Sequence, residues 1–196
     1  MARSMINIEA NRTALLVMDF QVDIVGMIGD KGGPIVERVV NLIAAARAAQ
    51  MPVIYVVVGF RAGYPELNPR NATFSMLAKS NRFVAGTPGA EIYPAVKPHD
   101  GDVVVTKHRV SAFTGTDMDM ILRAKGIETL VLCGISTSGV VLSTVRHAAD
   151  ADYRLVVVKD GCADGDDEVH RVLTEKVFAR QTTVTTASEV VAALAK

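Results

Sequence analysis

The sequence predicts an α/β fold, a three-layer α/β/α sandwich around a six-stranded, mostly parallel sheet. Short apolar runs rich in Val, Ile and Leu recur along the chain, amphipathic stretches alternate with them, and Gly residues mark several of the turns. Strands of this composition are typical of a parallel sheet covered by helices on both faces. The chain has 196 residues, 49% of them hydrophobic, so we expect one domain over residues 1–196, with residues 1–10 as an N-terminal arm.

The apolar runs and the stretches between them assign the elements in order. We expect strands at 13–19, 53–58, 103–106, 129–133, 154–158 and 182–185. The expected helices are 34–50, 116–125, 139–151, 166–180 and 188–195. Pro34 suits a first helical turn, Gly126 suits a helix end, and the acidic run from Asp164 to Glu168 suits a helix N-terminus. Residues 59–89 are rich in Gly, Pro and Asn and predict a long loop with a short helix at 73–79.

Two chemically reactive side chains stand at the ends of predicted strands. Asp19 ends the first strand and Lys107 follows the third. Because the carboxyl ends of parallel strands open on one edge of the sheet, these two side chains are expected to meet. A lysine lowers the pKa of a neighbouring carboxyl and burial raises it, which is one way to obtain a carboxyl ready for proton transfer. A structural ion pair is the alternative for the pair taken alone.

A third segment, LVLCGISTSGVV, ends a strand in a turn bracketed by Gly134 and Gly139. Together with ALLVMDFQVD at 14–23 and the whole of 86–164, it resembles the isochorismatase-like hydrolase family, also called the cysteine hydrolase superfamily. The resemblance covers nearly the whole chain from residue 11 onward. It implies the Rossmann-like fold of that family and a catalytic set of Asp, Lys and Cys, in which Asp19 and Lys107 match the first two.

Val140 stands where the family carries its nucleophilic Cys, the seventh position of the turn counted from Gly134. A valine has no lone pair, so the thioester route of the family's amidases is closed. Cys133 precedes the turn and reads as a buried small hydrophobe. Ser136, Thr137 and Ser138 offer hydroxyls, but no base stands beside them in the sequence.

The resemblance also implies roles for the backbone of the turn. In relatives a non-proline cis peptide falls there, which here is Ile135 to Ser136, and the N–H groups of Ser136 and Val140 are expected to form an oxyanion site. We expect Phe20, Gln21, Arg61, Phe113 and Thr137 to contribute to substrate binding. Core packing for the two phenylalanines and solvation for Arg61 are the alternatives.

These residues leave more than one function open. The leading interpretation is a hydrolase of a small molecule that uses Asp19 as acid or base, without metal or thioester. Isochorismatases proper cleave a vinyl ether and lack the Cys, so an enol ether substrate is a second possibility, although ISTSG is more similar to the amidase side of the family. The alternative from another class is a disarmed family member that binds a small ligand.

Composition restricts partners and compartment. With 21 basic and 21 acidic residues, the chain offers no electrostatic case for nucleic acid or an anionic membrane. Cys133 and Cys162, in a chain without a secretion signal, predict a reduced, cytoplasmic protein. Some relatives hold a metal with histidines of the long loop, but none of the four histidines here lies in it, so we expect no metal and no cofactor. The family commonly associates, and a homo-oligomer is expected.

Overall fold

Six parallel strands form a single sheet in the computed structural model, which describes residues 6–195. The order across the sheet is β3-β2-β1-β4-β5-β6. The strands are β1 (Thr13–Met18), β2 (Val53–Val58), β3 (Val103–Lys107), β4 (Thr129–Ile135), β5 (Arg154–Ala163) and β6 (Thr183–Thr185). The predicted α/β class and its six strands are confirmed, and all five strand pairs are parallel. Strand β5 continues five residues beyond the predicted end at 158.

Seven α-helices occur among the described residues. They are α1 (Val22–Met27), α2 (Gly32–Ala48), α3 (Ala72–Lys79), α4 (Met118–Ala124), α5 (Leu142–Asp150), α6 (Asp167–Val172) and α7 (Ala187–Leu194). The prediction missed α1, whose six residues include Gly26 and are too short for a clear helical period. The helix expected from residue 139 is preceded by a wider turn, Thr137–Val141, with non-helical backbone at Gly139.

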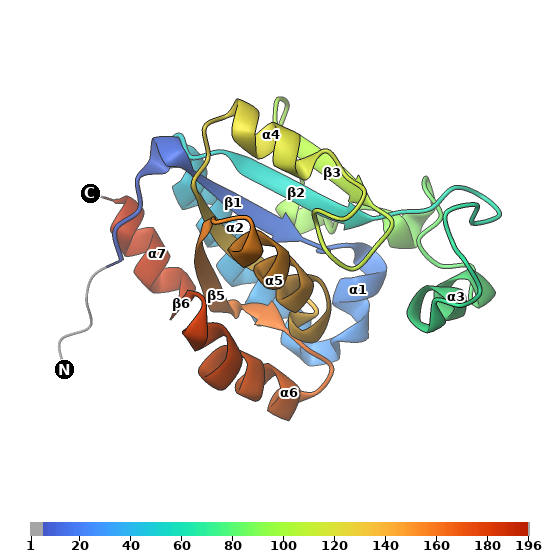
Figure 1. The fold of residues 1–196 in the computed structure, drawn as a ribbon. Helices are drawn as coiled ribbons and strands as arrows, with labels where there is room; N and C mark the ends of the chain where they lie inside the picture. Colours follow the sequence, from blue (N-terminus) through green and yellow to red (C-terminus); the bar gives the residue numbers. More distant parts are fainter. Residues whose placement is uncertain (1–5, 196) are drawn as a thin grey trace.

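Helices cover both faces of the sheet, so each face has its own core. Figure 1 shows α4 and α5 in front of the sheet and α2 behind it. Strand β1 is buried at every position, with Leu16 and Met18 in the cluster that includes α5 residues and Leu15 and Val17 in the cluster that includes α2 residues. Each such side chain contributes about 1.5 to 3 kcal/mol when it leaves water. The paired cores explain why the strands read as continuous apolar runs.

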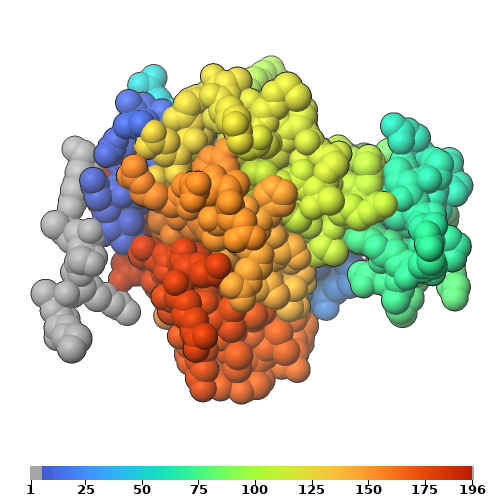
Figure 2. Space-filling model, viewed as in Figure 1, coloured from blue at the N-terminus to red at the C-terminus, as the bar shows by residue number. Residues whose placement is uncertain are grey.

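The chain between β2 and β3 forms a separate lobe around α3. Figure 2 shows it, in teal and green, standing out from the body of the molecule. A small cluster of Val58, Phe60, Phe74 and Phe83 holds it to the end of β2. The side chain of Asn71 caps α3 by accepting a hydrogen bond from the Phe74 N–H. The short helix predicted at 73–79 is therefore present, one residue longer.

The ends of the chain bear on two further expectations. Ile6 and Ile8 of the expected N-terminal arm pack against the α2-side core, while residues 1–5 of that arm lie outside the described residues. Among the described residues, no helix combines the length and the apolar character needed to cross a membrane.

The order of the strands shows where in the sheet a ligand-binding crevice is expected. From β1 the chain runs outward through β2 to β3, and it then returns to β4 on the other side of β1. In open parallel sheets this reversal leaves a crevice at the carboxyl ends of the two central strands. Here those strands are β1, which leads into Asp19, and β4, which leads into the turn Thr137–Val141.

Close packing of β4 on β1 gives a test of the fold. A methyl group at Gly134 would lie 3.0 Å from both the Cβ and the carbonyl oxygen of Met18. We expect Gly134→Ala to lower the free energy of unfolding by about 1 to 3 kcal/mol, since the strand backbone must shift. Gly33→Ala in α2 is the control, because a methyl group there meets nothing within 4 Å and stabilises a helix. Urea unfolding measures both; equal stability of the two variants would contradict the packing.

Candidate functional site

A buried ion pair lies at the carboxyl edge of the sheet. Lys107 Nζ is 2.9 Å from Asp19 Oδ2, and the two side chains are only 3% and 7% exposed. Asp19 directly follows β1 with a φ of 59°, in the left-handed region, and its N–H donates to the carbonyl of Val56. Lys107 is the last residue of β3 and pairs in register with Val58. The predicted meeting of these two side chains across the end of β2 is present.

The carboxyl group of Asp19 is only half satisfied. Its Oδ1 atom is buried and has no hydrogen-bond partner among the described residues. Burial raises the pKa of Asp19 above its usual range, and the charge and hydrogen bond of Lys107 lower it only in part. A buried oxygen without a partner is uncommon and is often a functional feature. The carboxyl therefore holds its proton more firmly than an exposed aspartate does, and its Oδ1 atom has no partner among the described residues.

Next to this pair, the turn after β4 has an unusual backbone. The Ile135–Ser136 peptide bond is cis, in agreement with the resemblance. The N–H of Gly139 donates to the side chain of Ser136, and the N–H of Val141 donates to the Ser136 carbonyl. A Cβ at position 139 would lie 2.6 Å from Ser136 Oγ, so a larger residue there would require the Ser136 side chain, which accepts from the Gly139 N–H, to move. A compact turn of this kind keeps its backbone dipoles in fixed directions.

Val140 in this turn is 2% exposed and belongs to the α5-side core cluster. It provides neither thiol nor hydroxyl. The two cysteines do not replace it, because both are buried and hydrogen-bonded to strand carbonyls, Cys133 to Leu16 and Cys162 to Leu132. Burial raises the pKa of the Cys133 thiol well above its usual value and that of Cys162 to about 12. Neither supplies a thiolate at neutral pH.

The remaining predicted residues have different surroundings. Phe20 is buried in the α2-side cluster, and Phe113 stacks on His147 of α5 with ring centroids 4.6 Å apart. Arg61 is 74% exposed at its side chain and pairs with Glu66. Thr137 is fully buried in the turn after β4. These contacts are structural, and the substrate-binding roles remain predictions.

Gln21 has a more specific place than the sequence indicated. Its amide nitrogen donates to the carbonyls of Val58 and Ala90, and its oxygen accepts from the N–H of Val58. The side chain thus ties the end of β2 to the lobe. Val58 is the residue of β2 that pairs with Lys107, so these hydrogen bonds hold the backbone beside the ion pair.

Two residues that the prediction did not include contact the turn. Asp164 Oδ2 accepts from the N–H of Ser138 at 2.7 Å, and His170 Nδ1 lies 2.8 Å from Thr137 Oγ1. Asp164 was assigned to a helix N-terminus, whereas Asp166 caps α6. The prediction ended this strand at residue 158. In the structure β5 continues to Ala163, which pairs with Ile135 of β4, so Asp164 lies beside the turn.

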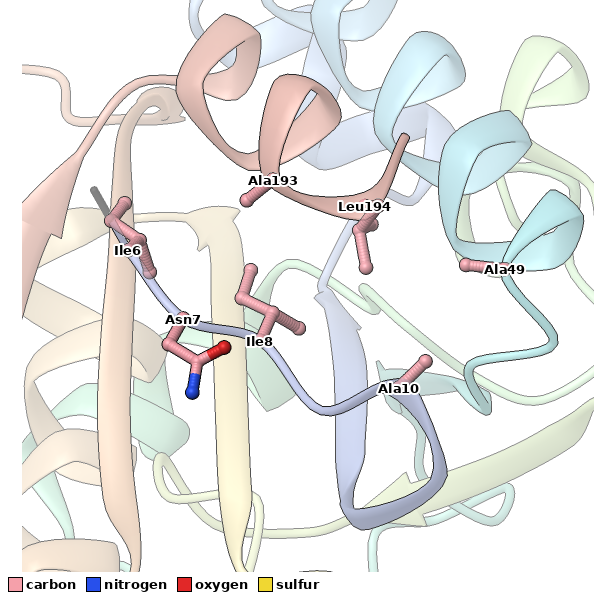
Figure 3. Close-up of a pocket in the computed structure, with 7 residues that line it drawn as sticks. All are labelled: Ile6, Asn7, Ile8, Ala10, Ala49, Ala193 and Leu194. Atoms are coloured by element: carbon pink, nitrogen blue, oxygen red, sulfur yellow. The ribbon is translucent and has the colours of Figure 1, made fainter. Parts of the chain in front are cut away.

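One pocket, of about 340 Å³, is lined by Asp164 and His170 beside the turn after β4, and another lies away from the ion pair. Figure 3 shows the second, of about 510 Å³, between the N-terminal segment and the ends of α2 and α7, lined by Ile6, Asn7, Ile8, Ala10, Ala49, Ala193 and Leu194. It contains no acid, base or nucleophile, so it offers no chemistry. No group of three or more His, Cys, Asp or Glu side chains in the described part of the chain is placed to hold a metal ion.

The ion pair itself gives a prediction. We expect Lys107→Met to raise the pKa of Asp19 further, because the substitution removes the cation that opposes burial. Carbon-13 NMR of the Asp19 carboxyl, followed against pH, measures the change. Arg61→Met is the control, since Arg61 pairs with Glu66 and not with Asp19. An unchanged pKa in Lys107→Met would show that the two groups do not interact in solution.

Comparison with known proteins shows which family the sequence matches. The isochorismatase domain model matches residues 13–189. The isochorismatase family protein YwoC of Bacillus subtilis is 34% identical over 89% of this chain and 90% of its own length. Ureidoacrylate amidohydrolase RutB of Methylorubrum extorquens is 34% identical over 78% of this chain and 70% of its own length.

Solved structures give the same result. A cysteine hydrolase from Pseudomonas syringae superposes with a TM-score of 0.90 at 26% identity, covering 100% of this chain and 99% of the other. N-carbamoylsarcosine amidase from Thermoplasma acidophilum superposes with a TM-score of 0.76 at 29% identity, covering 90% and 96%. The chain belongs to the isochorismatase-like, or cysteine hydrolase, family.

Proposed function

We propose that this family hydrolase acts on a small molecule with Asp19 as its acid or base, without a metal and without a thioester intermediate. The observation that carries the proposal is the half-satisfied carboxyl of Asp19, buried beside Lys107 with Oδ1 unpartnered among the described residues. A second carboxylate or an imidazole is not needed, because one carboxyl can both take and return a proton within a single turnover. We propose that Lys107 positions the carboxyl group of Asp19 and stabilises its negative charge.

The names of two relatives suggest which type of bond is cleaved. Two of them bear the names of amide-cleaving enzymes, ureidoacrylate amidohydrolase and N-carbamoylsarcosine amidase. With Val140 at the nucleophile's place, water must attack the carbonyl carbon directly. Asp19 takes one proton from that water as the C–O bond forms, and the N–H groups of Ser136 and Val140 bind the oxyanion. The proton then passes to the leaving nitrogen as the C–N bond breaks.

Vinyl ether cleavage would use the same carboxyl in the opposite protonation state. Protonated Asp19 would deliver its proton to the enol ether carbon, and water would add to the resulting oxocarbenium ion. The raised pKa of Asp19, caused mainly by burial, favours this acid role. The two routes therefore differ in pH dependence, since a base is active when ionised and an acid is active when protonated.

The first test is turnover on a panel of ureido acids, simple amides and enol ethers. We expect Asp19→Asn to abolish activity, whereas Asp119→Asn, an exposed carboxyl paired with Arg123, leaves it unchanged. Turnover that rises as pH increases through the pKa of Asp19 identifies the base route, and turnover that falls identifies the acid route. Full activity in Asp19→Asn would refute the proposal.

A disarmed protein that binds a ligand without turnover is the second candidate. Its supporting observation is the close packing of Val140, 2% exposed, where an attacking group would stand. In this case the wild type would bind the panel compounds, detected as thermal stabilisation, and cleave none of them. The same panel therefore separates the two functions.

Substitution at 140 gives a further prediction. We expect iodoacetamide to leave wild-type turnover intact, because both native cysteines are buried with a raised pKa. We expect it to inhibit Val140→Cys, because position 140 is the proposed place of substrate attack and must open whenever substrate enters. Val141→Cys, one residue beyond that place and equally buried, is the matched control and should not acquire sensitivity. Thiol-sensitive turnover in the wild type would contradict the thioester-free route. Amidase activity confined to Val140→Cys would indicate the disarmed protein.

A further inference from the structure

The turn after β4 is held from outside by side chains of a different part of the chain. Asp164, at the end of β5, is 9% exposed and bonds the Ser138 N–H through Oδ2 at 2.7 Å. His170, half-buried on α6, bonds the fully buried Thr137 hydroxyl through Nδ1 at 2.8 Å. The two contacts join consecutive residues of the turn to two separate elements. Each therefore limits a different direction of movement.

Both contacts lie within the stretch that carries the proposed oxyanion donors. Thr137 and Ser138 stand between Ser136 and Val140, the residues whose N–H groups are proposed to bind the oxyanion. The turn's own bonds, from Gly139 and Val141 back to Ser136, set its internal shape. Its position relative to Asp19 is set at one end by β4, which pairs with β1, and further along by contacts with other elements, among them the bonds to Asp164 and His170. A misplacement of about 1 Å costs roughly 100-fold in rate when donors must meet a developing charge.

We propose that Asp164 and His170 are positioning residues that hold the turn Thr137–Val141 in register with Asp19. This inference rests on the proposed function. Asp164 keeps its own geometry because its second oxygen, Oδ1, accepts from the N–H of Asp166, the residue that caps α6. The cap and the two contacts thus link the start of α6 to the turn as one hydrogen-bonded frame.

Matched pairs of variants test the frame. Asp164→Asn keeps an oxygen that can accept from the Ser138 N–H. His170→Asn keeps an amide close to the place of Nδ1 that can donate to or accept from the Thr137 hydroxyl, whereas Asp164→Ala and His170→Ala keep no polar group. We expect kcat to fall roughly 10- to 100-fold in the two alanine variants with little change in KM, and to be largely retained in the two asparagine variants. A merely structural role would lower the melting temperature without this split.

Hydrogen exchange of the Ser138 N–H, measured by NMR, tests the frame without any substrate. We expect faster exchange in Asp164→Ala than in the wild type and near wild-type exchange in Asp164→Asn, with altered amide shifts at Val140 in both alanine variants. If the wild type cleaves no panel substrate but these NMR changes occur, the frame stands and the proposed function fails. Unchanged exchange and shifts in the alanine variants, or an equal loss of kcat in the asparagine variants, would overturn the frame.

Discussion

The buried pair of Asp19 and Lys107 is the interaction on which the rest of the site depends. Removing two charges from water is costly, and their attraction offsets that cost only where the geometry is good and the remaining polar atoms are bonded. Here the distance is 2.9 Å, yet Oδ1 of Asp19 has no partner among the described residues. The remaining imbalance is consistent with a carboxyl that exchanges a proton.

Rigid surroundings let the fold maintain this imbalance. Asp19 follows a strand buried on both faces, and its neighbours β2 and β4 pair with β1 in parallel register. Gln21 ties the end of β2 to the lobe, and the Asp164 and His170 contacts tie the turn after β4 to β5 and α6. The free-energy cost of one unsatisfied polar atom is thus offset by the packing of strands and helices around it. The proposed chemistry thus belongs to the ends of the strands, and stability comes from the packed strands and helices of the same sheet.

In our proposal Val140 replaces a nucleophile, and most of the site remains intact. Val140 packs into the α5-side core, and the turn around it keeps the hydrogen bonds from Gly139 and Val141 to Ser136. Backbone donors do not depend on the side chain of the residue that carries them, so an anion site and a thiol can be lost independently. Asp19 and Lys107 are almost completely buried, so the proposed function requires some movement at this edge to admit a substrate. The lobe around α3 is the neighbouring element with a core of its own.

Sequence alone determined the fold class, five of the helical regions, the short helix α3 and the encounter of Asp19 with Lys107. Helix and strand patterns are local in the sequence, and their alternation implies a parallel sheet whose strand ends meet at one edge. Tertiary structure decided what depends on contacts between distant segments. It extended β5, inserted α1, bound Gln21 to Val58 and Ala90, and brought Asp164 and His170 to the turn. It also left Oδ1 of Asp19 without a partner, since the satisfaction of a polar atom depends on every group folded around it.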